Sequence, residues 1–87
     1  MKVGEYIRTL INELKETRGI DAQFGEKRMP GVGYKYTIGV WTDELASNRM
    51  YKTFILTDET FATAKDSVIE YAIKSKFDEL VEEFVAS

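Results

Sequence analysis

The sequence predicts an α+β fold, a two-layer sandwich with the element order α-β-β-β-α. Apolar residues recur every three to four positions in two segments, one near each end of the 87-residue chain, as in amphipathic helices. Between these segments, three short stretches alternate apolar and polar residues and are separated by turns, which indicates a three-stranded antiparallel meander. We expect both helices, including a long C-terminal one, to cover one face of this sheet.

Length and composition restrict what the chain can be. A chain of 87 residues forms one domain, residues 1–87, and has no room for a second core. Its hydrophobic content of 44% is enough to fill that core. The sequence contains no cysteine and no histidine, so it lacks the usual zinc ligands and the commonest general base. We therefore expect no metal site, no cofactor and no enzymatic activity.

The first helix is predicted over residues 3–17. Its apolar stripe steps by four, three and four residues, through Val3, Ile7, Leu10 and Leu14. Gly19 follows this segment, and glycine commonly takes the left-handed conformation that ends a helix.

The first two strands are predicted at residues 20–28 and 34–42, joined by a turn at 29–33. Pro30 fixes its own φ and Gly31 accepts a positive φ, as a type II turn requires. The second strand is the clearer of the two, because alternate positions on one face are apolar. These positions are Tyr34, Tyr36, Ile38 and Val40.

The third strand is predicted at residues 49–57, after a polar connection at 43–48. Its inward face is ambiguous because both alternating sets are apolar. One set contains Met50, Phe54 and Leu56, and the other contains Tyr51, Thr53 and Ile55.

Residues 58–86 are predicted to form one long helix, capped by Thr57 or Asp58. Such a helix spans about 40 Å and an eight-residue strand about 26 Å, so about three turns extend past the sheet. The overhanging turns carry an apolar stripe, namely Phe77, Leu80, Val81 and Phe84. Either the helix breaks near Lys74-Ser75 and folds back, or the stripe is an oligomer interface that forms a homodimer through antiparallel C-terminal helices.

A basic, aromatic cluster lies in and beside the predicted hairpin. Lys27, Arg28 and Lys35 combine with Tyr34 in a pattern that suits single-stranded nucleic acid, in which bases stack on rings and cations contact phosphates. However, Tyr34 shares its strand face with Ile38, which assigns the ring to the core and leaves only its hydroxyl for solvent.

The element order resembles that of double-stranded-RNA-binding domains, over about residues 4–73 and in layout only. The resemblance implies RNA contacts from the first helix, from the loop between the first two strands, and from lysines that open the last helix. Here that last helix opens with TDETFATAKDS, which places Asp58 and Glu59 where lysines are needed and leaves Lys65 alone with the right charge. Carboxylates at this point would repel phosphates.

The only tryptophan, Trp41, is expected on the sheet face opposite the helices. Its expected neighbours are Lys35 and an apolar pair from the third strand, either Tyr51 with Ile55 or Phe54 with Leu56. Such a surface is larger than scattered exposed apolar residues explain, and tryptophan and tyrosine dominate binding hot spots. The alternative is that the 43–48 connection or the end of the long helix covers Trp41.

These observations favour a small non-enzymatic binding protein that acts through macromolecular contacts, and most simply protein–protein contacts. The expected partner-binding residues are Lys27, Arg28, Lys35, Trp41 and Tyr51. A small, single-domain chain without a cofactor and with residues typical of interfaces suggests an accessory or inhibitor protein, such as those that phages and mobile elements encode. The alternative is a weak nucleic-acid-binding module that uses the basic 27–35 hairpin loop. The N-terminus lacks the apolar run of a signal peptide, and we expect a cytoplasmic protein without a membrane span.

Overall fold

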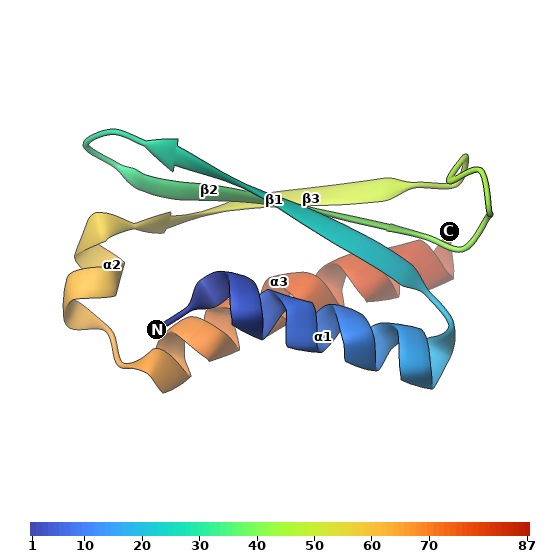
Figure 1. Cartoon of the computed structure of the whole chain (residues 1–87), viewed down its shortest axis with the longest axis horizontal. Coiled ribbons are helices and arrows are strands. Elements are labelled where there is room, and N and C mark those ends of the chain that lie inside the picture. The colour runs from blue at the N-terminus through green and yellow to red at the C-terminus, as the bar shows by residue number, and fades with distance from the viewer.

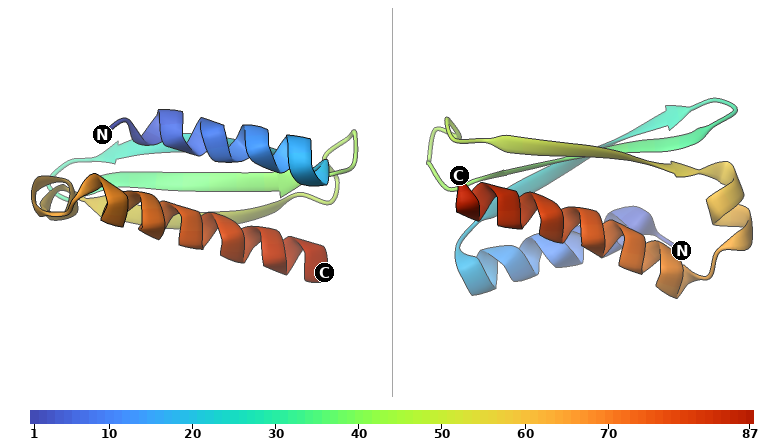
Figure 2. Two further views of the ribbon diagram at one scale, coloured as in Figure 1. Left: turned by 90° about the horizontal axis from the view of Figure 1, so that it is seen from below. Right: turned by 180° about the vertical axis from the view of Figure 1, so that it is seen from behind.

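Three strands form one antiparallel sheet in the order β1-β2-β3, with β1 at Asp21–Met29, β2 at Gly33–Trp41 and β3 at Met50–Thr57. The computed structural model describes all 87 residues. Helices α1 (Val3–Arg18) and α3 (Asp66–Ala86) lie against one face of this sheet, and no helix covers the other face (Figure 1, Figure 2). The predicted two-layer α+β sandwich is confirmed.

The core lies between the sheet and the two long helices. The stripe predicted for the first helix, Val3, Ile7, Leu10 and Leu14, is buried there. Gly19 ends α1 with a φ of 66°, and its N–H donates to the carbonyl oxygen of Lys15 at 3.0 Å. From β2, the predicted inward residues Tyr36, Ile38 and Val40 are all less than 3% exposed. The alternation in the sequence therefore identified the buried face of the central strand correctly.

The turn between β1 and β2 has the predicted geometry. Gly31 takes a φ of 77°, and the N–H of Val32 donates to the carbonyl oxygen of Met29 at 3.0 Å. These are the features of a type II turn with Pro30 in its second position. Gly33, just after the turn, also takes a positive φ, of 154°, and packs directly against the backbone of β3.

The register settles which face of β3 points inward. Tyr36 pairs with Phe54 and Tyr34 with Leu56, so that Phe54 and Leu56 join the core. Lys52 lies on the same face, at its margin, and its ammonium contacts the carboxylates of Glu83 and Glu79 on α3. The other set, Tyr51, Thr53 and Ile55, is exposed on the opposite face.

The C-terminal segment forms two helices, so the prediction of one long helix over residues 58–86 was wrong. Helix α2 covers Asp58–Thr63, and Ala64 and Lys65 then take extended backbone angles before α3 begins. Figure 1 shows α2 as a corner at one end of the sheet, from which α3 runs back beneath the strands. The sequence suggested a possible break near Lys74-Ser75, but the observed break at Ala64 and Lys65 lies well before that point.

Two contacts hold α2 at this corner. The Thr57 side chain caps the helix by accepting a hydrogen bond from the N–H of Thr60 at 3.1 Å. The N–H of Asp58 donates to the carbonyl oxygen of Val32 at 2.9 Å, which ties α2 to the β1–β2 turn. The chain can therefore reverse direction at the end of the sheet rather than continue past it.

The predicted oligomer stripe lies inside the molecule. Phe77, Leu80 and Val81 are 4%, 0% and 4% exposed and pack in the core, and Phe84 is partly buried against it. The premise of the homodimer interface, an exposed stripe that overhangs the sheet, was wrong because the break after α2 brings this stripe under the strands. No helix of the chain is both long enough and apolar enough to cross a membrane.

Candidate functional site

The candidate site is the sheet face that no helix covers, which we call the open face. In an antiparallel sheet, directly paired residues point to the same side, so the register defines this face. Its strand residues are Asp21, Gln23, Gly25, Lys27, Met29, Gly33, Lys35, Thr37, Gly39, Trp41, Tyr51, Thr53, Ile55 and Thr57. Tyr51 is 55% exposed and Ile55 is 47% exposed, whereas Trp41 is half-buried.

One end of the open face carries a cluster that we call the Arg49 corner, formed by Gly39, Trp41, Arg49 and Tyr51. The Arg49 guanidinium lies over the Trp41 ring, 4.8 Å from its centroid, in a cation–π contact. Its Nη1 also donates a hydrogen bond to the Tyr51 hydroxyl at 3.2 Å. The Tyr51 ring lies over Gly39, where a Cβ atom would come within 2.9 Å of it. Arg49 therefore flanks the Trp41 ring, and α3 lies on the other side of the sheet (Figure 1).

The other end of the open face carries two lysines side by side, and we call this site the lysine hollow. Lys27 and Lys35 are direct cross-strand partners, and neither contacts a carboxylate within 4 Å. Like charges in this position oppose folding, so the pair is not explained by stability. A hollow of about 220 Å³ opens beside them, lined also by Gly25, Glu26 and Thr37.

Arg28 does not belong to this surface, although the sequence grouped it with the lysines. Its guanidinium forms a two-pronged ion pair with the Asp58 carboxylate, at 2.6 and 3.1 Å, and lies 5.0 Å from the centroid of the Tyr34 ring. A further hydrogen bond runs from Nη1 to the carbonyl oxygen of Gly33. The hydrogen bonds that Arg28 donates to the Asp58 carboxylate lower the pKa of that carboxyl group. The Arg28 side chain therefore joins the hairpin to α2 on the helical side.

Ion pairing differs between the two sides of the molecule. Seven of the twelve Lys and Arg side chains contact a carboxylate within 4 Å. The five that contact none are Arg8, Lys27, Lys35, Arg49 and Lys65. Three of these five lie on the open face. The one strand carboxylate of that face, Asp21, pairs with Lys15 at 3.1 Å.

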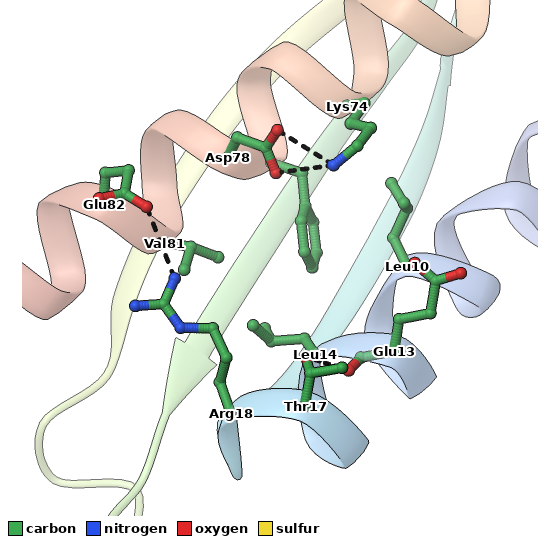
Figure 3. Close-up of a pocket in the computed structure, with 10 residues that line it drawn as sticks. Leu10, Glu13, Leu14, Thr17, Arg18, Lys74, Asp78, Val81 and Glu82 are labelled. Atoms are coloured by element: carbon green, nitrogen blue, oxygen red, sulfur yellow. Dashed lines mark hydrogen bonds and ion pairs between the residues drawn. The ribbon is translucent and has the colours of Figure 1, made fainter.

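Two other hollows lie on the helical side. One, of about 220 Å³, is a groove between α1 and α3, with the ion pairs Arg18–Glu82 and Lys74–Asp78 at its rim (Figure 3). Both cations that line this groove are paired, and Glu13 adds a third carboxylate, so the groove offers no unpaired cation to an acidic ligand.

The second hollow, of about 360 Å³, lies at the start of α1 beside Tyr34, Tyr36 and Phe61. Burial, together with the neighbouring Glu26 carboxylate, raises the pKa of the Tyr36 phenol. Nowhere in the chain do three or more carboxylates gather into a group that could hold a metal ion.

The structure thus brings four of the five predicted partner-binding residues onto one surface, Lys27, Lys35, Trp41 and Tyr51, and removes Arg28 from it. Sequence reasoning missed Arg49, which completes the cluster at Trp41. A signal for it existed, because the pairing of Gly39 with Tyr51 places the next outward pair at Trp41 and Arg49.

Comparisons with known proteins add no family to this description. The chain matches no protein-family model, and neither a curated protein nor a solved structure matches it significantly.

Proposed function

We propose that this chain is a small non-enzymatic protein that acts by binding another protein through the open face, as an accessory or inhibitor protein does. The observation that carries the proposal is the Arg49 corner. There an arginine, a tryptophan and a tyrosine, the three residue types most enriched in binding hot spots, contact one another on the sheet face that no helix covers.

The composition of the open face supports this proposal. Trp41 and Tyr51 lie toward one end of this face, Ile55 pairs with Lys35 toward the other end, and Thr37 and Thr53 lie between them. A surface that mixes aromatic and apolar side chains with polar ones is typical of protein–protein interfaces taken as a whole. The mutual contacts of Arg49, Trp41 and Tyr51 also hold these side chains in place before binding, which reduces the entropy lost on association.

The experiment that tests the proposal is affinity capture with the chain as bait, followed by reconstitution. A captured protein is identified by mass spectrometry, purified, and titrated against the chain by calorimetry. We expect Tyr51→Ala to weaken its binding by at least about tenfold, since truncation of a hot-spot residue costs about 2 kcal/mol or more. Tyr71→Ala is the matched control, because Tyr71 is a more exposed tyrosine on α3, and it should leave the affinity unchanged.

If Tyr51→Ala and Trp41→Ala bind as tightly as the unmodified chain while Tyr71→Ala does not, the binding surface is the helical side and the proposed site is wrong.

A second candidate function is weak binding of single-stranded nucleic acid, favoured by the unpaired cations Lys27, Lys35 and Arg49 and by the Trp41 and Tyr51 rings on the same face. Two observations count against it. Arg28, expected to contact phosphates, is paired with Asp58, and the Arg49 guanidinium covers one side of the Trp41 ring on which a base would stack. Binding to an oligothymidylate that exceeds the affinity for any captured protein, and that falls steeply with salt, would favour this function instead.

A further inference from the structure

The open face is basic on a chain whose net charge is −3, and this contrast identifies the kind of partner it fits. Three unpaired cations point from it, namely Lys27, Lys35 and Arg49. Its strands contribute one carboxylate, Asp21, which already has a cationic partner in Lys15. The remaining acidic strand residue, Glu26, lines part of the lysine hollow, but it lies on the helical face by alternation and its carboxylate neighbours the Tyr36 hydroxyl.

We propose that the partner is an acidic protein surface, which places one carboxylate at the Arg49 corner and a second in the lysine hollow. This inference rests on the proposed function, because it names the chemistry of the partner for the same open face. The two anchor points are separated by six residues along β2, from Lys35 to Trp41, or about 20 Å at 3.3 Å per residue.

The Arg49 corner suits a carboxylate because the guanidinium is already oriented and still has free donors. Its only hydrogen bond is the one from Nη1 to the Tyr51 hydroxyl, so that the Nε and Nη2 edge of the planar group remains open. That edge matches the two oxygens of a carboxylate. The nearby Asp43 carboxylate does not occupy it, because Asp43 accepts hydrogen bonds from the Ser47 hydroxyl and the Leu45 N–H within its own loop.

The lysine hollow suits a carboxylate for a different reason. Lys27 and Lys35 stand directly opposite each other and repel, and a bound anion between them relieves this repulsion. Beside them, Gly25 leaves open space, because a Cβ atom built there would meet no other atom within 4 Å. The hollow therefore has both the charge and the room for one acidic side chain.

A protein explains the rest of the face better than a nucleic acid does. Between the two anchor points lie Thr37, Thr53 and Gly39, and the exposed, apolar Ile55 pairs with Lys35 beside the lysine hollow. These residues offer contact area but no charge to a polyanion. A nucleic acid carries a negative charge at every nucleotide, and proteins bind it through a continuous, positively charged groove. Two cationic points with an uncharged middle instead fit a folded surface with acidic side chains at its edges.

The first experiment uses poly-L-glutamate as the probe and amide chemical shifts of the isotope-labelled chain as the readout. We expect shift changes at the Arg49 corner and at the lysine hollow, with affinity that falls as salt rises. Arg49→Gln, and separately Lys27→Gln with Lys35→Gln, should each weaken binding by about tenfold, as expected for the loss of a charge-assisted contact. Arg8→Gln with Lys65→Gln is the matched control, since these are the two unpaired cations outside the open face, and it should change the affinity little.

Charge reversal keeps the test decisive if binding is weak. Arg49→Glu together with Lys27→Glu should abolish binding to poly-L-glutamate and create binding to poly-L-lysine at the same amides. Far-UV circular dichroism and urea unfolding serve as controls that each variant is folded. Shift changes centred on Arg8 or Lys65, no change at the open face at millimolar probe, or tighter binding of an oligothymidylate to that face would each overturn the inference.

The reconstituted partner separates this inference from the proposed function. If Tyr51→Ala abolishes its binding and Arg49→Gln leaves it unchanged, the open face binds a protein but the partner is not acidic there. If none of the open-face variants changes the affinity, both proposals fail.

Discussion

The two faces of the sheet are built from the same three strands but meet opposite requirements. The face toward the helices carries Tyr36, Ile38, Val40, Phe54 and Leu56, all buried. The open face alternates with it residue by residue and carries glycines, threonines, unpaired lysines and the Arg49 corner. Because successive residues of a strand point to opposite sides, the same strands serve folding on one side and are free for binding on the other.

The largest expected effect compares two isoleucines on opposite faces. Ile38, 1% exposed, packs in the core, whereas Ile55, 47% exposed, lies on the open face. We expect Ile38→Ala to lower the free energy of unfolding by about 2–5 kcal/mol and Ile55→Ala to lower it by less than about 1 kcal/mol. Urea unfolding followed by circular dichroism measures both. Equal losses would mean that the open face is covered and that the comparison is wrong.

Gly33 is the position on the open face where stability should matter most. Its φ is 154°, and a Cβ atom there would lie 2.7 Å from the Cα of Thr57, against backbone that cannot rotate away. We expect Gly33→Ala to lower the free energy of unfolding by about 1–3 kcal/mol, as overpacking does. Gly25→Ala, where a Cβ atom meets only open space, is the matched control in the same urea experiment and should cost clearly less. The reverse ranking would contradict this account of the hairpin.

Gly39 should behave differently from Gly33, because the atoms in its way belong to the movable ring of Tyr51. A Cβ atom at Gly39 would lie 2.9 Å from Cε1 and 3.0 Å from Cδ1 of that ring. We expect Gly39→Ala to cost less than about 1 kcal/mol in stability but to displace Tyr51 and break its hydrogen bond with Arg49. The fluorescence of the single tryptophan, Trp41, should then shift. A large loss of stability without any change in fluorescence would show that Gly39 serves the fold instead.

The smallest expected effect depends on pH and concerns the helical side. Arg28 lowers the pKa of Asp58 in the folded chain below its ordinary value of 3.8. The pair therefore stabilises the fold above about pH 3.8, and this contribution disappears as the pH falls through the lowered pKa. We expect Asp58→Asn to be less stable than the unmodified chain at pH 7 and to lose this deficit as the pH falls below about 3.8 and through the lowered pKa of Asp58, in urea unfolding at each pH. A deficit that is constant with pH would point to lost capping at α2.

The sequence predicted local features well and the relative placement of distant segments poorly. Periodicity identified α1 and the inward face of β2, and Pro30 with Gly31 identified the turn, because each signal is confined to a few neighbouring residues. The break at Ala64-Lys65 carries no proline or glycine, so no local signal marked it. The burial of Phe77 and Leu80 follows from that break, and for this reason the stripe was interpreted as an interface.

The candidate site shows the same division. Alternation placed Trp41 and Lys35 on the face opposite the core, as the register confirms. The pairing of Arg28 with Asp58 joins residues thirty positions apart, and only the fold reveals it. The contact of Arg49 with Trp41 crosses the loop between two strands, and it required the register rather than the pattern of either strand alone.

Two inward-pointing cations, Lys52 on β3 and Arg28 on β1, affect whether the edges of the sheet can pair with a strand of another molecule. Both outer strands have an unpaired edge, and such edges can recruit further strands and lead to aggregation. On β3, Lys52 points inward at the edge and is held by Glu79 and Glu83, and on β1, Arg28 is held by Asp58. A strand added at either edge would crowd these ion pairs and remove them from water. Each outer strand thus carries an inward-pointing charge that disfavours edge-to-edge pairing with another sheet, so the same side chains that fasten the sheet to the helices also oppose its aggregation.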